Sequence, residues 1–444
     1  MIKDDEIKKL KEKILSLEKY VKECDISNKD KNFNSIKNNM NNINKMNENA
    51  KNNLLLIFNK PPLVGLNNIG ASFYMNSTLQ CLSQTFPLTN YMLDPNNKQF
   101  YNIDNLDSND EINLKLTPSY AHLIKQLWFN KDGNTSFAPY FFKNTINKLN
   151  PLLQKKEACD AKDLIIFILK QMHKELRNPI IDSKNNSQNL ILNQYNRKNV
   201  FYSFINNYKK KYSIISEIFY GFKEITNICL NCENICKPQN LDIPKCYNYD
   251  IFNCLIFPLE EIKKMKYINI SVQNKNSVNN SVTIYDCFEY NQRTEKYTGK
   301  DQKYCNLCKQ FSDSIYSSKI YYCPNVLILI LNRGKDNEYD TKLDFEENID
   351  ISEYILEKDL NNKIIYNLYG VISHTEENEP SSHFIANCKS AIDGNWYRFD
   401  DILVEKINNI QKEVIEFGSP YILFYNKQNY DNNIIFKFNS MKQN

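Results

Sequence analysis

The sequence predicts an α+β fold, in which helices come first along the chain and antiparallel strands follow. Helical periodicity, with apolar residues three or four positions apart, runs through NSTLQCLSQTFPLTNYML and CDAKDLIIFILKQMHKELR. The β-rich stretches lie mostly in the last third of the chain: NVLILILN, YNLYGVISH, HFIANCKS, NWYRFDD and PYILFYN. Helices and strands that are segregated in this way are typical of an α+β domain. We expect this folded unit to occupy residues 63–426.

Two flanking regions and a tail complete the predicted organisation. In residues 1–24, apolar side chains recur at spacings of three and four: Ile7, Leu10, Ile14, Leu17 and Val21. This short heptad pattern predicts either a partner helix or homodimer through residues 7–24, or an amphipathic helix that packs on its own domain. Residues 25–62 are rich in Asn and Lys and have little periodicity, which predicts a disordered linker, and residues 427–444 form a polar tail.

Composition limits the classes of function. The 56 basic and 52 acidic residues give a net charge of +4, too small for the global field of a nucleic-acid-binding protein. No apolar run approaches the roughly 20 residues of a membrane span, and the N-terminus lacks the apolar core of a secretory signal. We therefore expect neither a nucleic-acid nor a membrane partner, and an intracellular location in the cytoplasm or nucleus. In a reducing compartment the 13 cysteines are expected as thiols or metal ligands.

Four cysteines form two CxxC pairs, which predicts one zinc site. The pairs are CLNC, with Cys229 and Cys232, and CNLC, with Cys305 and Cys308. Each pair can hold one side of a tetrahedral ion, and four thiolates leave no place for a catalytic water, so the zinc would be structural. The long segment between the pairs would leave the metal and return to it. The alternative is four ordinary thiols.

Several motifs in one order give the chain a family resemblance. They are GLNNIGASFYMNSTLQCL, EACDAKDL, FYGF before the first CxxC, the two CxxC pairs, CPNVLILILNR, YNLYGVISH with SSHF, NWYRFDD and PYILFY. Together they resemble the ubiquitin-specific protease family of deubiquitinating enzymes across most of the chain. The resemblance implies a papain-like fold with a thumb, a palm and zinc-bearing fingers over about residues 222–312. It also implies that ubiquitin is the partner, with its tail threaded between thumb and palm.

Hydrolysis by a thiol needs a thiolate, a histidine that moves the proton, a group that orients this histidine and a donor to the oxyanion. The resemblance places His383 at the catalytic-histidine position and Asp400 at the orienting position, with Asp401 beside it as a substitute. It places Asn68 at the oxyanion-hole position. Each residue also has an ordinary structural interpretation. His383 would be a structural histidine between strands, Asp400 and Asp401 would form a solvated acidic turn, and Asn68 would be a turn-forming residue.

The nucleophile position is occupied by Phe73. The family has cysteine there, at a helix N-terminus whose dipole lowers the thiol pKa, whereas a benzyl group has no lone pair. Phe73 is also bulky enough to fill the slot of the ubiquitin tail, and it fits ordinary core packing equally well. Ser72 and Ser77 point elsewhere on the helix, and Cys81 lies over two turns away, facing the core. Cys and Phe codons differ by a single base, so the alternative that Phe73 is a misrecorded cysteine stays open.

Other positions also depart from the family pattern. Ser382 replaces the glycine before the histidine, and LNRG replaces LKRF after the core strand. Asp160 and Asp163 remain as acids on one helical face, which suits pairing with the arginine-bearing tail of ubiquitin; the alternative is two solvated surface acids.

The leading functional hypothesis is a ubiquitin-binding protein with the protease fold and impaired hydrolysis, a pseudo-deubiquitinase. One alternative is an active cysteine-type deubiquitinase whose nucleophile is misrecorded or displaced. The other is a structural assembly subunit in which Phe73 plugs the tail channel.

Overall fold

The structure is a computed structural model, and it describes most of the predicted folded unit. The described residues are 60–94, 115–129, 133, 135–154, 160–177, 194–239, 241–272, 281–334, 341–356, 363–375, 383–417 and 419–429. The predicted helix over 1–24, nearly all of the predicted linker and tail, and Ser382 lie outside these residues. Among the described helices, none has both the length and the apolar character that crossing a membrane requires.

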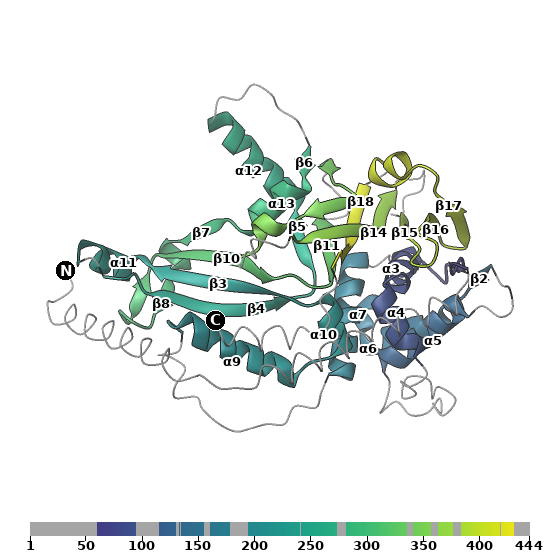
Figure 1. Ribbon diagram of the computed structural model, residues 1–444, viewed down its shortest axis with the longest axis horizontal. Coiled ribbons are helices and arrows are strands. Elements are labelled where there is room, and N and C mark those ends of the chain that lie inside the picture. The colour runs from purple at the N-terminus through teal and green to yellow at the C-terminus, as the bar shows by residue number, and fades with distance from the viewer. Residues whose placement is uncertain are drawn as a thin grey trace, which may run out of the picture.

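The thumb is a group of helices at one end of the molecule (Figure 1). Its helices are α3 (Phe73–Ser83), α4 (Phe86–Leu93), α5 (Leu116–Trp128), α6 (Tyr140–Leu149), α7 (Ala161–Leu176) and α10 (Ile214–Phe219). α7 follows the predicted periodicity, with a buried stripe of Leu164, Ile165, Ile168, Leu169 and Met172. It begins at Asp160, whose carboxylate accepts a hydrogen bond from the Lys162 amide at 2.8 Å, as an N-cap should. The helix before the fingers is α9 (Arg197–Lys210).

The palm is an eight-stranded sheet with the order β17-β16-β15-β14-β18-β11-β5, and β13 pairs with β14. The strands are β5 (Leu255–Pro258), β11 (Val326–Asn332), β13 (Asn348–Asp350), β14 (Ile365–Thr375), β15 (His383–Lys389), β16 (Trp396–Asp400), β17 (Leu403–Lys406) and β18 (Ser419–Lys427). All pairings are antiparallel except that of β5 with β11.

Both faces of the palm sheet are covered, which explains the unbroken apolar run of β11. Val326, Ile328 and Ile330 belong to the core shared with the thumb helices. Leu327 and Leu329 point to a second core. That second core includes residues of α12 (Leu259–Val272) and α13 (Ile284–Asn291), next to the short pair β6 (Val282–Thr283) and β12 (Leu343–Asp344).

The fingers are a four-stranded antiparallel sheet that extends away from the thumb and palm (Figure 1). Its order is β4 (Lys245–Phe252), β3 (Gly221–Cys229), β10 (Ser314–Tyr322) and β7 (Thr294–Tyr297). The tip carries α11 (Leu230–Cys236) and the hairpin of β8 (Lys303–Cys305) and β9 (Gln310–Ser312). Because β10 pairs along the length of β3, the sheet continues to Tyr322, ten residues past the expected end. The segment between the CxxC pairs leaves the fingers, contributes β5, α12 and α13, and returns, as its length suggested.

A short parallel pair joins the chain before α3 to the thumb: β1 (Gly65–Leu66) and β2 (Ser136–Phe137). A Cβ at Gly65 would lie 2.5 Å from the carbonyl oxygen of Ile402, so only glycine permits this approach to the palm. The remaining elements are the 3-10 helices Pro151–Gln154, Lys237–Gln239, Gly299–Asp301 and Ser352–Tyr354 and the π-helix Gln411–Ile415. The α+β prediction is confirmed, with helices early and the palm strands late.

Candidate active site

The loop before α3 holds an unusual backbone conformation. Gly70 has a φ of 93° and Ala71 a φ of 45°, in the left-handed region that favours glycine. The Lys143 ammonium of α6 donates to the carbonyl oxygens of Ile69 at 2.8 Å and Gly70 at 2.6 Å. These bonds fix the turn that delivers Phe73 to the first position of α3.

Phe73 points at the histidine that the family resemblance identified. Its ring centroid lies 5.4 Å from that of His383, with the ring planes inclined by 57°, and 6.5 Å from that of Phe384. Only 7% of Phe73 is exposed. The helix N-terminus and the histidine thus converge on one side chain, and this side chain carries no nucleophilic or ionisable atom.

His383 and Asp400 form the predicted pair. Nε2 of His383 lies 2.7 Å from Oδ1 of Asp400, and their side chains are 26% and 37% exposed. The pair arises because β15 begins at His383 and the neighbouring antiparallel strand β16 ends at Asp400. This geometry is that of a carboxylate that orients an imidazole and selects its tautomer.

Asp401 has a different place. Its Oδ1 accepts a hydrogen bond from Nδ2 of Asn76 at 2.7 Å, and its carbonyl oxygen accepts one from the Leu66 amide at 2.7 Å. Nδ2 of Asn76 also lies 3.2 Å from the carbonyl oxygens of Leu66 and Asn67. Asp401 therefore ties the palm to α3 and to the chain before it, and it is Asp400 that bonds to His383.

Asn68 lies in the same loop, four residues before the helix cap. Its Oδ1 accepts hydrogen bonds from the Ser72 amide at 3.1 Å and the Ser72 hydroxyl at 3.3 Å. These bonds fix the plane of the amide group, whose donor atom is Nδ2. An oxyanion hole requires such a donor near the helix N-terminus.

The two hydroxyls that flank Phe73 form hydrogen bonds within the chain, and the next thiol along α3 is buried. Ser72 is fully buried, and its hydroxyl accepts from the Ile69 amide at 2.9 Å. The Ser77 hydroxyl donates to the Tyr74 carbonyl at 3.1 Å. Cys81 has no exposed surface, its Sγ lies 3.6 Å from Sγ of Cys388, and burial raises its pKa. A buried thiol with a raised pKa is a poor nucleophile.

The two acids of α7 differ in their surroundings. Asp160 caps the helix, and its two carboxylate oxygens accept from the Tyr421 hydroxyl at 2.6 and 2.5 Å. Burial, followed by the Asp160 charge, raises the pKa of Tyr421, so this hydroxyl stays a donor. Asp163, in the first turn of α7, is exposed. No sequence pattern indicates the roles of Tyr421, Asn76 and Lys143, because their partners lie far away in the chain.

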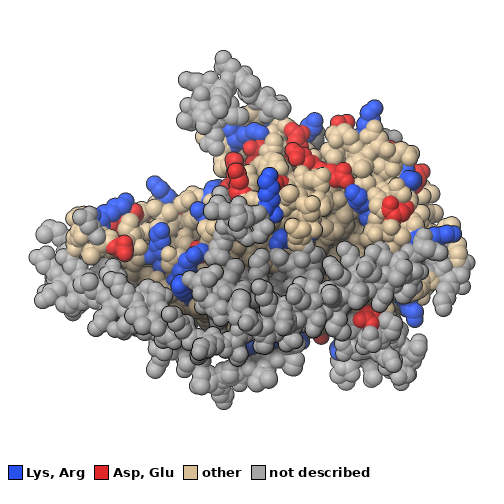
Figure 2. Space-filling model, in the orientation of Figure 1, with Lys and Arg blue, Asp and Glu red and all other residues tan. Residues whose placement is uncertain are grey.

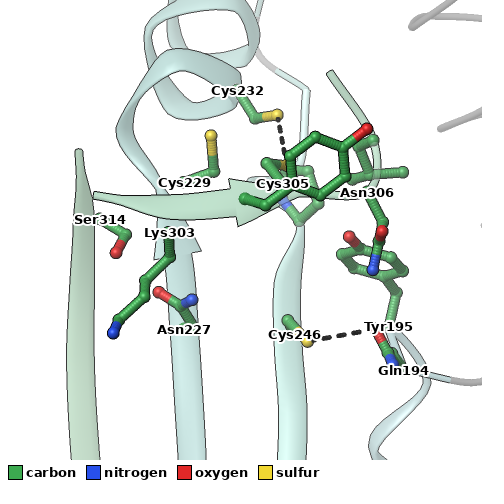
Figure 3. A pocket seen from close by; sticks show the side chains of 13 residues that line it. Gln194, Tyr195, Asn227, Cys229, Cys232, Cys246, Lys303, Cys305, Asn306 and Ser314 are labelled. Atoms are coloured by element: carbon green, nitrogen blue, oxygen red, sulfur yellow. Dashed lines mark hydrogen bonds between the residues drawn. The ribbon is translucent and has the colours of Figure 1, made fainter. Parts of the chain in front are cut away.

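The four predicted metal ligands converge at the fingertip. The Sγ atoms of Cys229, Cys232, Cys305 and Cys308 all lie within 4.8 Å of one another. Cys229 and Cys308 are 3.8 Å apart, and Cys232 and Cys305 are 3.7 Å apart. A tetrahedron with zinc–sulfur bonds of about 2.3 Å has sulfur–sulfur edges of about 3.8 Å. The donor set and its spacing thus fit zinc, and Figure 3 shows three of these cysteines at one end of a fingertip pocket.

Comparisons with known proteins find relatives that are named ubiquitin carboxyl-terminal hydrolases. Ubiquitin carboxyl-terminal hydrolase 2 of Homo sapiens is 26% identical over 371 residues, covering 82% of this chain and 55% of that protein. Ubiquitin carboxyl-terminal hydrolase 17-like protein B of Mus musculus is 25% identical over 371 residues, covering 83% of this chain and 64% of that protein. The chain thus spans little more than half the length of such curated relatives.

Solved structures show the same fold. The SAGA Ubp8/Sgf11/Sus1/Sgf73 DUB module bound to ubiquitin aldehyde matches with a TM-score of 0.57 and 23% identity, over 84% of this chain and 71% of that chain. The family model of ubiquitin carboxyl-terminal hydrolases matches residues 64–425, from β1 to the end of the palm sheet. The chain therefore belongs to the ubiquitin carboxyl-terminal hydrolase family, in its ubiquitin-specific protease branch.

Proposed function

We propose that this protein binds ubiquitin through its ubiquitin-specific protease fold and does not hydrolyse ubiquitin conjugates. The observation that carries the proposal is the Phe73 ring, which occupies the first position of α3 and faces His383. Acyl transfer to a thiol cannot begin without a nucleophile at this position.

The other active-site residues support descent of this protein from an enzyme that catalysed the hydrolase reaction. The His383–Asp400 pair has the arrangement needed to move a proton, and Asn68 carries a donor beside the helix N-terminus. Relatives are named hydrolases, and the matching Ubp8 module is bound to ubiquitin aldehyde. Binding is the part of that function which does not need the missing thiol.

The acids of α7 contribute to this proposal in different ways. The Asp160 carboxylate caps α7 and accepts from Tyr421, so it shapes the thumb beside β18. Asp163 is exposed and is the acid that meets an arginine of the ubiquitin tail. Four cysteines hold one structural zinc ion, which fixes the fingertip.

Two measurements on purified protein test the proposal. Turnover of ubiquitin-aminomethylcoumarin should be undetectable, and titration calorimetry with mono-ubiquitin should show binding. Turnover that disappears in His383→Ala would instead support an active enzyme with another nucleophile. Binding too weak to measure would support a purely structural subunit in which Phe73 closes the tail channel.

The variant Phe73→Cys tests whether the other active-site residues support catalysis once a thiol is present. Activity in this variant, with a loss of about 10²- to 10⁴-fold on adding His383→Ala, would show that only the nucleophile is missing. Mass spectrometry of the natural protein's peptide over residues 65–82 checks the identity of Phe73. Location in the cytoplasm or nucleus and self-association through residues 7–24 remain predictions.

A further inference from the structure

The ring of Phe73 lies in the space that a thiol and a substrate carbonyl group would share. In hydrolysis by a thiol, the sulfur lies within hydrogen-bond reach of the imidazole, and the carbonyl carbon approaches the sulfur to about 3 to 3.5 Å. In this chain the ring centroid of Phe73 is 5.4 Å from that of His383. Aromatic rings with centroids about 4.5 to 7 Å apart are in direct contact, so an acyl group has no room between these two side chains.

The ring also packs on further aromatic side chains, which hold it in place. Phe73 is 7% exposed, and its ring centroid lies 6.5 Å from that of Phe384. Phe384 in turn contacts Tyr421, with centroids 5.4 Å apart, and His374, with centroids 5.3 Å apart. A ring that left this position would leave a cavity among close-packed neighbours. Phe73 is therefore a fixed wall of the site and not a side chain that swings aside.

The same side chains join the thumb to the palm. The Tyr421 hydroxyl of β18 donates to the Asp160 carboxylate, whose two oxygens lie 2.6 and 2.5 Å away. Asp160 caps α7, whereas Phe384 lies on β15 beside Phe73 at the start of α3. The contacts thus run from α3 through β15 and β18 to α7. A peptide that entered between α3 and β15 would have to separate the first of these contacts.

The carboxyl terminus of ubiquitin would need the space that Phe73 fills. The family is named for hydrolysis at a carboxyl terminus. Such a reaction requires the terminal carbonyl group beside the nucleophile position, which is the first residue of α3, Phe73. Ubiquitin ends in a Gly-Gly pair, and a chain without side chains passes through narrow openings. Even this chain cannot enter a volume that a packed ring occupies.

We propose that Phe73 makes ubiquitin binding independent of the Gly-Gly terminus of ubiquitin. The ring keeps the terminus out of the catalytic centre, and the binding energy comes from the parts of ubiquitin that precede it. The ligand is therefore ubiquitin with any form of carboxyl terminus, whether free, shortened or joined to another protein. This inference rests on the proposed function of ubiquitin binding, and it names the class of ligand that the same site accepts.

The test is titration calorimetry with the full-length, zinc-loaded protein and three ligands. They are mono-ubiquitin, mono-ubiquitin that lacks the Gly-Gly pair, and mono-ubiquitin joined by its carboxyl terminus to the lysine side chain of a short peptide. The first two ligands have the same net charge, which matters because acidic and basic side chains both lie on the face of the palm that Figure 2 shows. We expect the three dissociation constants to agree within about threefold, because the glycines make no contact that contributes to affinity.

Phe73→Ala should create a preference for the intact terminus. Once the ring is removed, the glycine backbone can enter and form hydrogen bonds, each worth about two- to tenfold in affinity. We expect this variant to bind intact mono-ubiquitin at least about threefold more tightly than the shortened form. The matched control is Phe142→Ala, which removes another buried ring of the thumb, on α6, and should leave the two affinities equal. Circular dichroism checks that each variant is folded.

Phe73→Cys gives a second readout, because its smaller side chain also opens the space and its thiol reports what reaches it. Ubiquitin-propargylamide carries an alkyne at its carboxyl terminus, and a thiol adds across the triple bond so that sulfur and hydrogen both join the alkyne carbons and no group leaves. We expect an adduct at residue 73 of this variant, located by mass spectrometry of its peptides, and none in the natural protein. A folded Phe73→Cys protein without an adduct would overturn the inference, because a part of the chain other than the ring would then exclude the terminus.

The affinities separate failure of this inference from failure of the proposed function. If the natural protein binds intact mono-ubiquitin but binds the shortened form more than about threefold more weakly, the inference is wrong and the proposed function stands. The same conclusion follows if Phe73→Ala does not distinguish the two forms, or if Phe142→Ala distinguishes them equally well. Absence of binding for all three ligands would overturn the proposed function, and the inference with it.

Discussion

Phe73 is a packing side chain at the position where the proposed function lacks a nucleophile. Its ring is almost fully buried between the start of α3 and β15, beside His383 and Phe384. Apolar contact of this kind stabilises the folded state, whereas a cysteine poised for catalysis adds less packing. At the scale of one residue, the structure shows Phe73 in a packing role, and the predictions for this residue concern stability.

Phe73→Ala should therefore destabilise the protein. Removal of a buried phenylalanine side chain costs about 3 to 5 kcal/mol of unfolding free energy, because the contacts are lost and a cavity remains. Urea unfolding measures the change. Phe311→Ala is the matched control, since Phe311 is 68% exposed and should change stability by less than about 0.5 kcal/mol. Equal effects of the two substitutions would contradict the packing role of Phe73.

We expect Asp401 to contribute to the stability of the fold and Asp400 to orient His383. Asp401 has a left-handed φ of 47° and accepts from Asn76, so alanine loses both the hydrogen bond and a residue that tolerates this backbone. We expect Asp401→Ala to lower the unfolding free energy by about 1 to 3 kcal/mol.

Two related variants separate the roles of these aspartates. Asp401→Asn keeps the acceptor and the backbone tolerance, so its stability should stay near that of the wild type. Asp400→Asn should leave stability nearly unchanged but, in the Phe73→Cys protein, reduce any turnover. If Asp400→Asn destabilises more than Asp401→Ala, the assignment is wrong.

At the scale of elements, His173 links α7 to α10. Its Nδ1 lies 2.8 Å from the Ser213 hydroxyl, and Ser213 is the N-cap of α10. Burial, with smaller contributions from the Arg177 and Lys211 charges, lowers the pKa of His173 to about 4. An unfolded histidine has a pKa of about 6.5. Two thumb helices therefore meet through an imidazole that is neutral in the folded state.

This contact should make stability depend on pH. Between about pH 6.5 and 4 the unfolded chain takes up a proton that folded His173 does not, so the His173 contribution is lost as the pH falls. His173→Asn cannot titrate and should show a shallower fall in melting temperature across this range. The measured quantity is the difference in melting temperature between the wild type and His173→Asn at each pH. The titration of His122 and of the carboxylates contributes to both proteins and cancels in this difference. Parallel curves of melting temperature against pH for the wild type and the variant would show that His173 does not cause the pH dependence.

At the scale of the whole molecule, sequence and structure agree where the signal is local. The α7 stripe, the apolar run of β11 and the CxxC pairs each carry their pattern within a few residues, and each was predicted. The contacts of Asn76 with Asp401, Tyr421 with Asp160, and Lys143 with the loop before α3 join distant parts of the chain. No local periodicity encodes such pairings, because they arise only when thumb and palm pack together. The His383–Asp400 pair was expected because two family motifs flagged it.

The fingers should depend on metal more than the palm does. Among the residues that the structure describes, the hydrophobic cluster at the tip has Cys232, Cys236 and Leu307 as its buried members, whereas the two cores on either side of the palm sheet are extensive. With so little apolar surface buried at the tip, we expect metal binding to supply the free energy that orders it. The prediction is one zinc ion per chain, measured by atomic emission.

Removal of zinc should loosen the fingertip and leave the palm folded. After treatment with a zinc chelator, hydrogen exchange should rise in α11 and in the β8–β9 hairpin, while β14 and β18 keep their protection. Cys232→Ser should lose the ion and show the same local pattern. Cys246→Ser is the matched control, because Cys246 lies beside the cluster and contacts Gln194 but is not one of the four ligands. Zinc retained by Cys232→Ser, or lost by Cys246→Ser, would contradict the four-cysteine site, and a global rise in exchange would show that the metal supports the whole fold.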